Sequence, residues 1–174
     1  MYNIPMDLLA NSWHSILSLS TDVTIVLVIL GILIVYALYA GKEWITALIV
    51  SLPVSAWLFT ELPYSQKLLG DFSTTPGTLR NVAIFLVLLI PTMIMIGHRL
   101  SLDYPYSRAK KLIEAGALAI ITAGIALSLS QSIIPIKSFY TFSTGSILWL
   151  FGHPFSLFVW TFGGILALLF ILKR

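Results

Sequence analysis

Cysteine is absent from the 174 residues of this chain, and charged side chains make up only 10% of it. Without cysteine the chain can form no disulfide and can use neither thiolate catalysis nor a cysteine-ligated metal site. Soluble domains carry about 25% charged residues. The charges present sum to +3 and are spread along the chain. A nucleic-acid-binding surface needs clustered Lys and Arg, so we expect no nucleic acid partner.

Patterns of catalytic and cofactor-binding sites are missing as well. The chain has no G-x-S-x-G nucleophile elbow and no Gly-rich phosphate loop of either common type. None of its histidines, His14, His98 and His153, is spaced with a second ligand as in His-x-x-His or His-Glu-x-x-His. We therefore predict no catalytic, cofactor-binding or metal-binding residues and no cofactor, and we expect that the protein is not an enzyme.

Hydrophobic residues, in contrast, make up 58% of the chain. A soluble fold of this size cannot hide so much apolar surface in one core, and a lipid bilayer removes that difficulty. Residues 1–6 contain no Lys or Arg, whereas a cleavable signal peptide begins with a positive region. We expect insertion to be driven by the first membrane span itself.

The arrangement of the chain centres on residues 22–60, where two apolar runs are separated only by Gly41, Lys42 and Glu43. A continuous helix over this stretch would be about 58 Å long. The hydrocarbon core of a bilayer is about 30 Å thick, and such a helix would bury Lys42 and Glu43 in it. A tight helical hairpin, with Gly41–Glu43 as its turn at the water interface, avoids both problems.

The remaining apolar runs complete the predicted fold. The sequence predicts an all-α, polytopic integral membrane protein that forms a single membrane domain, a helical bundle with about five transmembrane helices. The spans are expected at residues 22–40, 44–60, 81–97, 112–132 and 155–172. Residues 5–20 are amphipathic and predict a separate interfacial helix, and Ser20, Thr21 and Asp22 could cap the first span. Residues 61–79 are expected to form a loop, and residues 146–151 a short interfacial turn of helix.

Orientation follows from the Lys and Arg residues, because cytoplasmic segments of membrane proteins are enriched in them. One face of the five-span topology collects Lys42, Arg99, Arg108, Lys110, Lys111, Lys173 and Arg174, and the other collects Lys67, Arg80 and Lys137. We therefore expect a multi-pass protein of the inner (plasma) membrane with its N-terminus outside and its C-terminus in the cytoplasm.

Two features of the spans are candidate sites. Glu114 is a carboxylate near the start of the fourth span, close to Lys110 and Lys111, and we expect it to be structural or solvated there, although an intramembrane acid can be functional. Small residues recur in the last two spans and let helices approach closely: Ala115, Gly116, Ala119, Ala123, Gly124, Gly163 and Ala167. They either pack spans of one chain together or form an interface with a second copy or another membrane protein.

The order of features resembles a known family. A span is followed by Gly41-Lys42-Glu43, a second span, a polar connection, Leu79-Arg80-Asn81, a third span, a charged loop and a small-residue fourth span. Over residues 22–134 this order is similar to the CvpA family, the colicin V production proteins of bacterial inner membranes. The fifth span and the N-terminal segment depart from the usual four-span pattern of that family.

The resemblance implies a non-enzymatic membrane protein that acts through partner proteins in export, envelope maintenance or toxin production. Two alternatives stay open. A small channel or transporter subunit would fit Pro53 and Pro91, since interrupted helices often flank transport sites. An accessory subunit of a larger membrane complex would fit the short loops and the small-residue faces.

Overall fold

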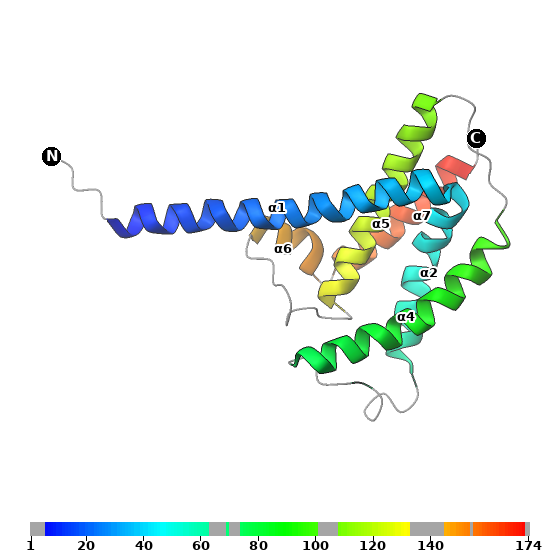
Figure 1. Ribbon diagram of the computed structural model, residues 1–174, viewed down its shortest axis with the longest axis horizontal. Helices are drawn as coiled ribbons and strands as arrows, with labels where there is room; N and C mark the ends of the chain where they lie inside the picture. Colours follow the sequence, from blue (N-terminus) through cyan, green and yellow to red (C-terminus); the bar gives the residue numbers. More distant parts are fainter. Residues whose placement is uncertain are drawn as a thin grey trace.

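Helices alone form the regular structure of the described chain. A computed structural model of the protein describes residues 6–62, 69, 74–100, 108–132, 145–153 and 155–172. Within these ranges the helices are α1 (Met6–Ala40), α2 (Lys42–Thr60), α4 (Thr75–Gly97), α5 (Arg108–Ser132), α6 (Gly145–Gly152) and α7 (Ser156–Leu172). Figure 1 shows α5 crossing behind α1, with α2 and α4 to one side of it. The prediction of an all-α fold is confirmed.

The longest element, α1, runs without interruption from Met6 to Ala40. This corrects the prediction of a separate helix over residues 5–20, because Ser20, Thr21 and Asp22 lie inside α1 and do not cap a new helix. The sequence has neither Gly nor Pro between Met6 and Leu30, and the Thr24 hydroxyl donates to the carbonyl of Ser20 at 2.7 Å. This hydroxyl bonds within the helix and so does not end it. In Figure 1 the N-terminal part of α1 extends beyond the other helices.

A single residue separates α1 from α2. Gly41 has a φ of 96°, a left-handed conformation that glycine adopts without strain. The hairpin predicted at Gly41–Glu43 is therefore present, but it is tighter than expected. Lys42 and Glu43 belong to the first turn of α2, so the second helix begins two residues before the predicted span.

The pairing of α2 with α4 is the most extensive between any two helices of the described chain. Near the start of α2, the ring of Trp44 packs edge-on against His98, with ring centres 5.9 Å apart. Near its end, Phe59 packs in the same manner against Phe85 at 6.1 Å. The two helices are therefore antiparallel.

The start of α4 lies at Thr75 and not at residue 81, which corrects part of the loop expected over residues 61–79. The side chain of Thr74 accepts a hydrogen bond from the N–H of Gly77, and Pro76 lies in the first turn. A hydroxyl N-cap and an early proline both favour a helix start. Residues 63–68 and 70–73 of that loop lie outside the described residues.

The contacts between helices show which helix ends lie together. The Gly41 turn, the end of α4 and the start of α5 lie together, because Trp44 touches His98 and Lys42 touches Glu114. We call this the basic end, since it carries Lys42, Arg99, Lys110 and Lys111. Along α7, Trp160 meets Gly124 and Gly164 meets Ile121. The C-terminus of α7 therefore points toward the basic end as well.

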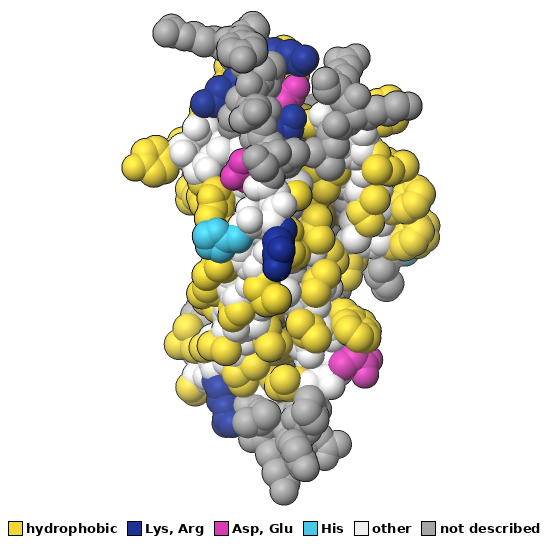
Figure 2. All heavy atoms as spheres, turned by 90° about the vertical axis from the view of Figure 1, so that its right-hand side faces the viewer, with side chains coloured by type: hydrophobic (Ala, Val, Ile, Leu, Met, Phe, Trp, Pro, Cys, Tyr) yellow, Lys and Arg dark blue, Asp and Glu magenta, His cyan; other side chains and the backbone are white. Residues whose placement is uncertain are grey.

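Four helices of the described chain are long and apolar enough to cross a membrane: Ser20–Ala40, Lys42–Thr60, Thr75–Gly97 and Ala109–Gln131. The short α6, which covers the helical turn expected at residues 146–151, forms a fifth candidate together with α7, and the two are bent by 63°. Apolar side chains face outward along these helices, as Val28, Ile32 and Val35 do on α1, while Lys42, Asn81 and Thr122 are buried. Figure 2 shows hydrophobic side chains over the middle of one face, with most of its Lys and Arg side chains toward the upper end.

Candidate functional site

A buried ion pair joins the start of α2 to the start of α5. The Nζ atom of Lys42 donates a hydrogen bond to Oε2 of Glu114 at 3.2 Å, and the two side chains are only 8% and 12% exposed. Because Gly41 reverses the chain in one residue, Lys42 enters the bundle directly at the first turn of α2. The pair thereby ties the α1–α2 turn to α5 and neutralises two charges inside the basic end.

This contact gives Glu114 a partner that the sequence did not reveal. The sequence predicted a structural or solvated role for the carboxylate, close to Lys110 and Lys111, and in the structure its side chain is only 12% exposed and pairs with Lys42. Lys42 was expected at the water interface and is also buried, whereas Lys110 is exposed. The two partners are 72 positions apart in the chain, so periodicity could not reveal them. The sequence did carry one indication of this contact, because the predicted topology places Lys42 and Glu114 near the same side of the membrane.

Two glycines allow α5 and α7 to approach closely. A Cβ atom on Gly124 would lie 2.1 Å from the ring of Trp160, and a Cβ on Gly164 would lie 2.8 Å from Cγ2 of Ile121. Both distances are far below ordinary contact, so these positions need glycine for the observed packing. We call this contact between α5 and α7 the glycine seam.

The predicted small-residue positions divide between the interior and the surface. Ala115, Ala119, Ala123 and Gly124 are buried within the chain, as internal packing of spans requires. Gly116 and Gly163 are different: no described atom lies within 4 Å of a Cβ built on either one. Ala167 is half-buried. Gly164, which packs against Ile121, was not among the predicted positions. The prediction relied on residues four positions apart, and the residue four positions before Ala167 is Gly163.

The two proline-containing helices share a hydroxyl contact. Ser55 Oγ lies 2.9 Å from Thr92 Oγ1, and Thr92 in turn donates to the carbonyl of Leu88. Since Thr92 has only one hydroxyl proton, Ser55 is the donor of the contact between α2 and α4. Ser51, two residues before Pro53, donates to the carbonyl of Leu48 at 3.2 Å. Both serines thus bond to acceptors other than the carbonyl that Pro53 leaves free at Ile49.

A groove separates α2 from α7, which touch only slightly. It consists of two adjoining hollows of about 490 and 410 Å³ that share Pro53, Trp57 and Thr161. The other lining residues are apolar apart from one threonine: Ile49, Val50, Val54, Ala56, Thr60, Leu157, Phe158 and Ile165. The hydroxyl oxygen of Thr161 is buried and has no hydrogen-bond partner within the described part of the chain. This α2–α7 groove therefore offers an apolar surface, with the unpaired hydroxyl of Thr161 buried beneath it.

The histidines lie apart from one another. His98 packs on Trp44 at the basic end, while His153 accepts a hydrogen bond from the N–H of Phe155 at 3.2 Å between α6 and α7. Across the described ranges, no group of three or more His, Asp or Glu side chains is arranged to hold a metal ion. Comparisons with family models, with curated proteins and with solved structures found no match for this chain.

Proposed function

We propose that this chain is a non-enzymatic, multi-pass integral membrane protein of the inner membrane that acts by binding other membrane proteins. The proposed role, in export, envelope maintenance or toxin production, rests on the resemblance to the CvpA family over residues 22–134. Apolar outward faces and buried polar groups support insertion, because soluble proteins rarely expose large contiguous apolar patches. Collection of Lys and Arg at the basic end supports a cytoplasmic C-terminus and an N-terminus outside.

The α2–α7 groove is the observation that carries this proposal. Its walls are apolar, and Thr161 holds a buried hydroxyl without a partner in the described residues. In lipid, helices associate through close van der Waals packing and through hydrogen bonds between side chains. A transmembrane helix of a partner protein can fill the space between α2 and α7 and pack against its apolar walls.

The test is a cross-linking experiment in native membranes. A photoreactive phenylalanine derivative at position 57 replaces Trp57, which is 63% exposed beside the groove. Val54→Trp narrows the groove, and Val35→Trp makes the same change on an outward position of α1. We expect cross-linking to a membrane protein in the parent and in Val35→Trp, and its loss in Val54→Trp.

Two outcomes would change the conclusion. A covalent dimer of this chain would make the partner a second copy. Light-induced products with lipid alone in all three proteins would contradict partner binding at this groove.

A second candidate function is that of a small channel or transporter subunit. The observation that favours it is the hydroxyl contact between Ser55 and Thr92, two residues from Pro53 and one from Pro91. Both prolines lie inside helices that continue past them, so the paired hydroxyls, and not a break in either helix, support a transport site here. Proteoliposomes that carry the purified protein test this function directly: ion flux that disappears in Ser55→Ala and Thr92→Val, with the fold intact, would favour a transporter over a partner-binding protein.

A further inference from the structure

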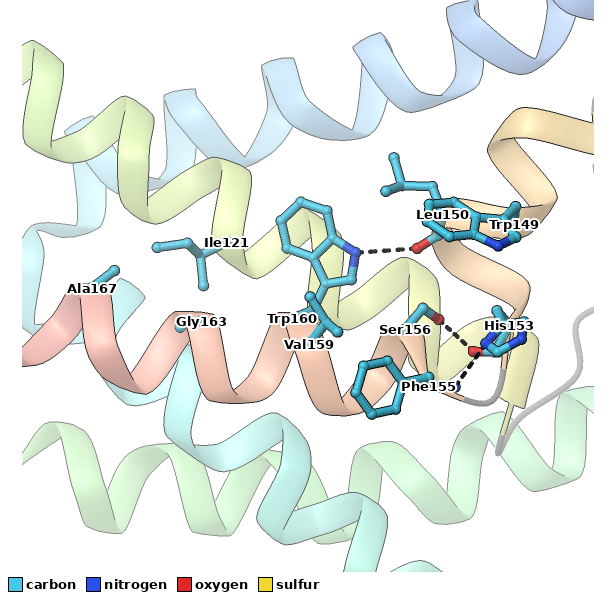
Figure 3. A pocket seen from close by; sticks show the side chains of 11 residues that line it. Ile121, Trp149, Leu150, His153, Phe155, Ser156, Val159, Trp160, Gly163 and Ala167 are labelled. Carbon is cyan, nitrogen blue, oxygen red and sulfur yellow. Dashed lines mark hydrogen bonds between the residues drawn. The ribbon is translucent and has the colours of Figure 1, made fainter.

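A second hollow lies on the opposite side of α7, between that helix, α5 and α6. It has a volume of about 370 Å³, within the range of about 300–1,000 Å³ typical of small-molecule sites. Figure 3 shows α7 along its length, with Gly163 and Ala167 toward one end and Phe155, Ser156 and His153 at the other. We call this hollow the α6–α7 groove.

The walls of the α6–α7 groove are held by contacts within the chain. Trp160 stacks on Phe151 with ring centres 5.8 Å apart, donates to the carbonyl of Leu150 at 3.3 Å and rests on Gly124. At the bend, the Ser156 hydroxyl lies within hydrogen-bonding distance of the carbonyls of Phe151 and His153, at 2.9 and 2.7 Å. The groove is therefore a preformed feature of the 63° bend between α6 and α7.

The length of the groove matches one leaflet of a bilayer. From Ser156 to Ala167 it follows α7 for about 17 Å at 1.5 Å per residue, and one leaflet contributes about 15 Å of hydrocarbon. Its wall on α5 is Ile121, which lies near the middle of the candidate span Ala109–Gln131. The groove thus begins at the end of the bundle opposite the basic end and reaches the middle of the span.

The inner part of the groove is lined by apolar side chains and glycines: Val159, Trp160, Gly163, Gly164, Ala167 and Ile121. The groove also changes in polarity along its length, because Trp149 and His153 lie at its outer end and Gly163 and Ala167 at its inner end. Trp side chains favour the headgroup level of a membrane.

We propose that the α6–α7 groove binds one acyl chain of a membrane phospholipid, taken from the leaflet opposite the basic end. The Nδ1 atom of His153 accepts the N–H of Phe155, which leaves the N–H at Nε2 as the ring's donor. That N–H and the indole N–H of Trp149, which is 71% exposed, are the donors at the outer end for ester or phosphate oxygens. The acyl chain packs along Val159, Gly163 and Ala167.

This inference rests on insertion in a membrane but not on partner binding at the α2–α7 groove. Gly163→Leu tests it, because a Cβ there meets no described atom within 4 Å and the leucine side chain can occupy the groove without displacing the fold. Gly31→Leu is the matched control, since Gly31 is an exposed helical glycine in α1 that is equally open among the described residues.

The first measurement is the mass of each protein by native mass spectrometry, after its release from mild detergent. We expect the parent and Gly31→Leu to retain the added mass of one phospholipid, and Gly163→Leu to lose it. Equal phospholipid retention in Gly163→Leu, or none in the parent, would overturn the proposal. A dimer that disappears only in Gly163→Leu would assign the groove to a second copy of the chain instead.

The second measurement locates the lipid. The protein is reconstituted in phosphatidylcholine vesicles that contain phosphatidylcholine with a diazirine on its acyl chain, and the cross-linked peptides are identified after irradiation. We expect enrichment on α7 between Val159 and Ala167. Labelling of equal intensity on the outward face of α1, at Val28, Ile32 and Val35, would show ordinary contact with bulk lipid and would overturn the proposal.

Discussion

Lysine and glutamate side chains are rarely as buried as Lys42 and Glu114, which are 8% and 12% exposed. Removing two charges from water costs free energy that their attraction offsets only when the geometry is good. The contact at 3.2 Å is a hydrogen-bonded pair, so each charge depends on the other. The main effect of the pair is therefore to fix the position of the α1–α2 turn against α5. Its net contribution to the free energy of unfolding is the smaller effect.

We predict that Glu114→Ala destabilises the protein by about 3 kcal/mol, because it leaves the Lys42 charge buried without a partner. The double variant Lys42→Met with Glu114→Leu should recover most of that loss, since two apolar side chains carry no desolvation cost. Lys110→Ala, which removes an exposed charge at the same end, is the control and should change little.

The thermal midpoint in detergent is compared for the parent, Glu114→Ala, the double variant and Lys110→Ala. A double variant that is no more stable than Glu114→Ala would show that the two side chains do not act as a pair.

For single residues, the sequence indicated which side chains are unusual more readily than it indicated which side chains contact each other. It singled out Lys42 and Glu114 separately, one as a turn residue and one as an acid near a span. Their contact joins positions 72 residues apart, and one sequence carries no record of such proximity. Asp22 was expected to cap a helix and is instead fully buried inside α1.

At the scale of elements, hydrophobicity located the helices but misplaced their ends. The predicted spans began where apolar residues began, yet α4 starts at Thr75 because of its threonine cap and early proline, and α5 starts at Arg108. Charged residues are good helix formers, so the apolar run and the helix need not share a boundary. In α1 the reason is different: the polar residues after Met6 are mainly Ser, Thr and Asn, which are weaker helix formers, but no Gly or Pro breaks the helix before Leu30.

The glycine seam gives a prediction with a matched control on the same helix. Gly124→Ala should destabilise the protein by about 1–3 kcal/mol, the usual cost of overpacking, because the new Cβ would lie 2.1 Å from the Trp160 ring. Gly116→Ala makes the same change where no described atom is within 4 Å. It should be neutral or stabilise by up to about 1 kcal/mol, since alanine favours helix more than glycine does.

Thermal unfolding in detergent, followed by circular dichroism, compares the two variants. Replacing Trp160 with leucine in the Gly124→Ala background should restore part of the stability, because the smaller side chain leaves space for the new methyl group. Equal midpoints for Gly124→Ala and Gly116→Ala would mean that α5 and α7 separate in the detergent-solubilised protein.

At the scale of the molecule, the alternation of helix directions is the feature that the sequence predicted best. Length ruled out one continuous helix over residues 22–60, and the structure turns the chain at Gly41. The ends that were expected on one face of the membrane, at the Gly41 turn, after α4 and before α5, do lie together at the basic end. The bend between α6 and α7 was not predicted, because Gly145, Gly152 and Pro154 indicate a break but not its angle.

The proposed membrane orientation can be measured with single cysteines, because the parent chain has none. Lys110 and Glu61 are suitable positions, since both are exposed and lie at opposite ends of the bundle. Lys42 is unsuitable because its side chain is buried in the pair with Glu114. In intact cells we expect a membrane-impermeant maleimide to label Glu61→Cys but not Lys110→Cys.

The physical reason for this expectation is the excess of Lys and Arg at the basic end, which favours its retention in the cytoplasm during insertion. Permeabilised cells should label both variants, which controls for access of the reagent to each cysteine. Labelling of Lys110→Cys alone in intact cells would invert the orientation while keeping the helix order. Labelling of both from outside would mean that the chain between them does not cross the membrane an odd number of times, and the alternating five-span topology would then have to be abandoned.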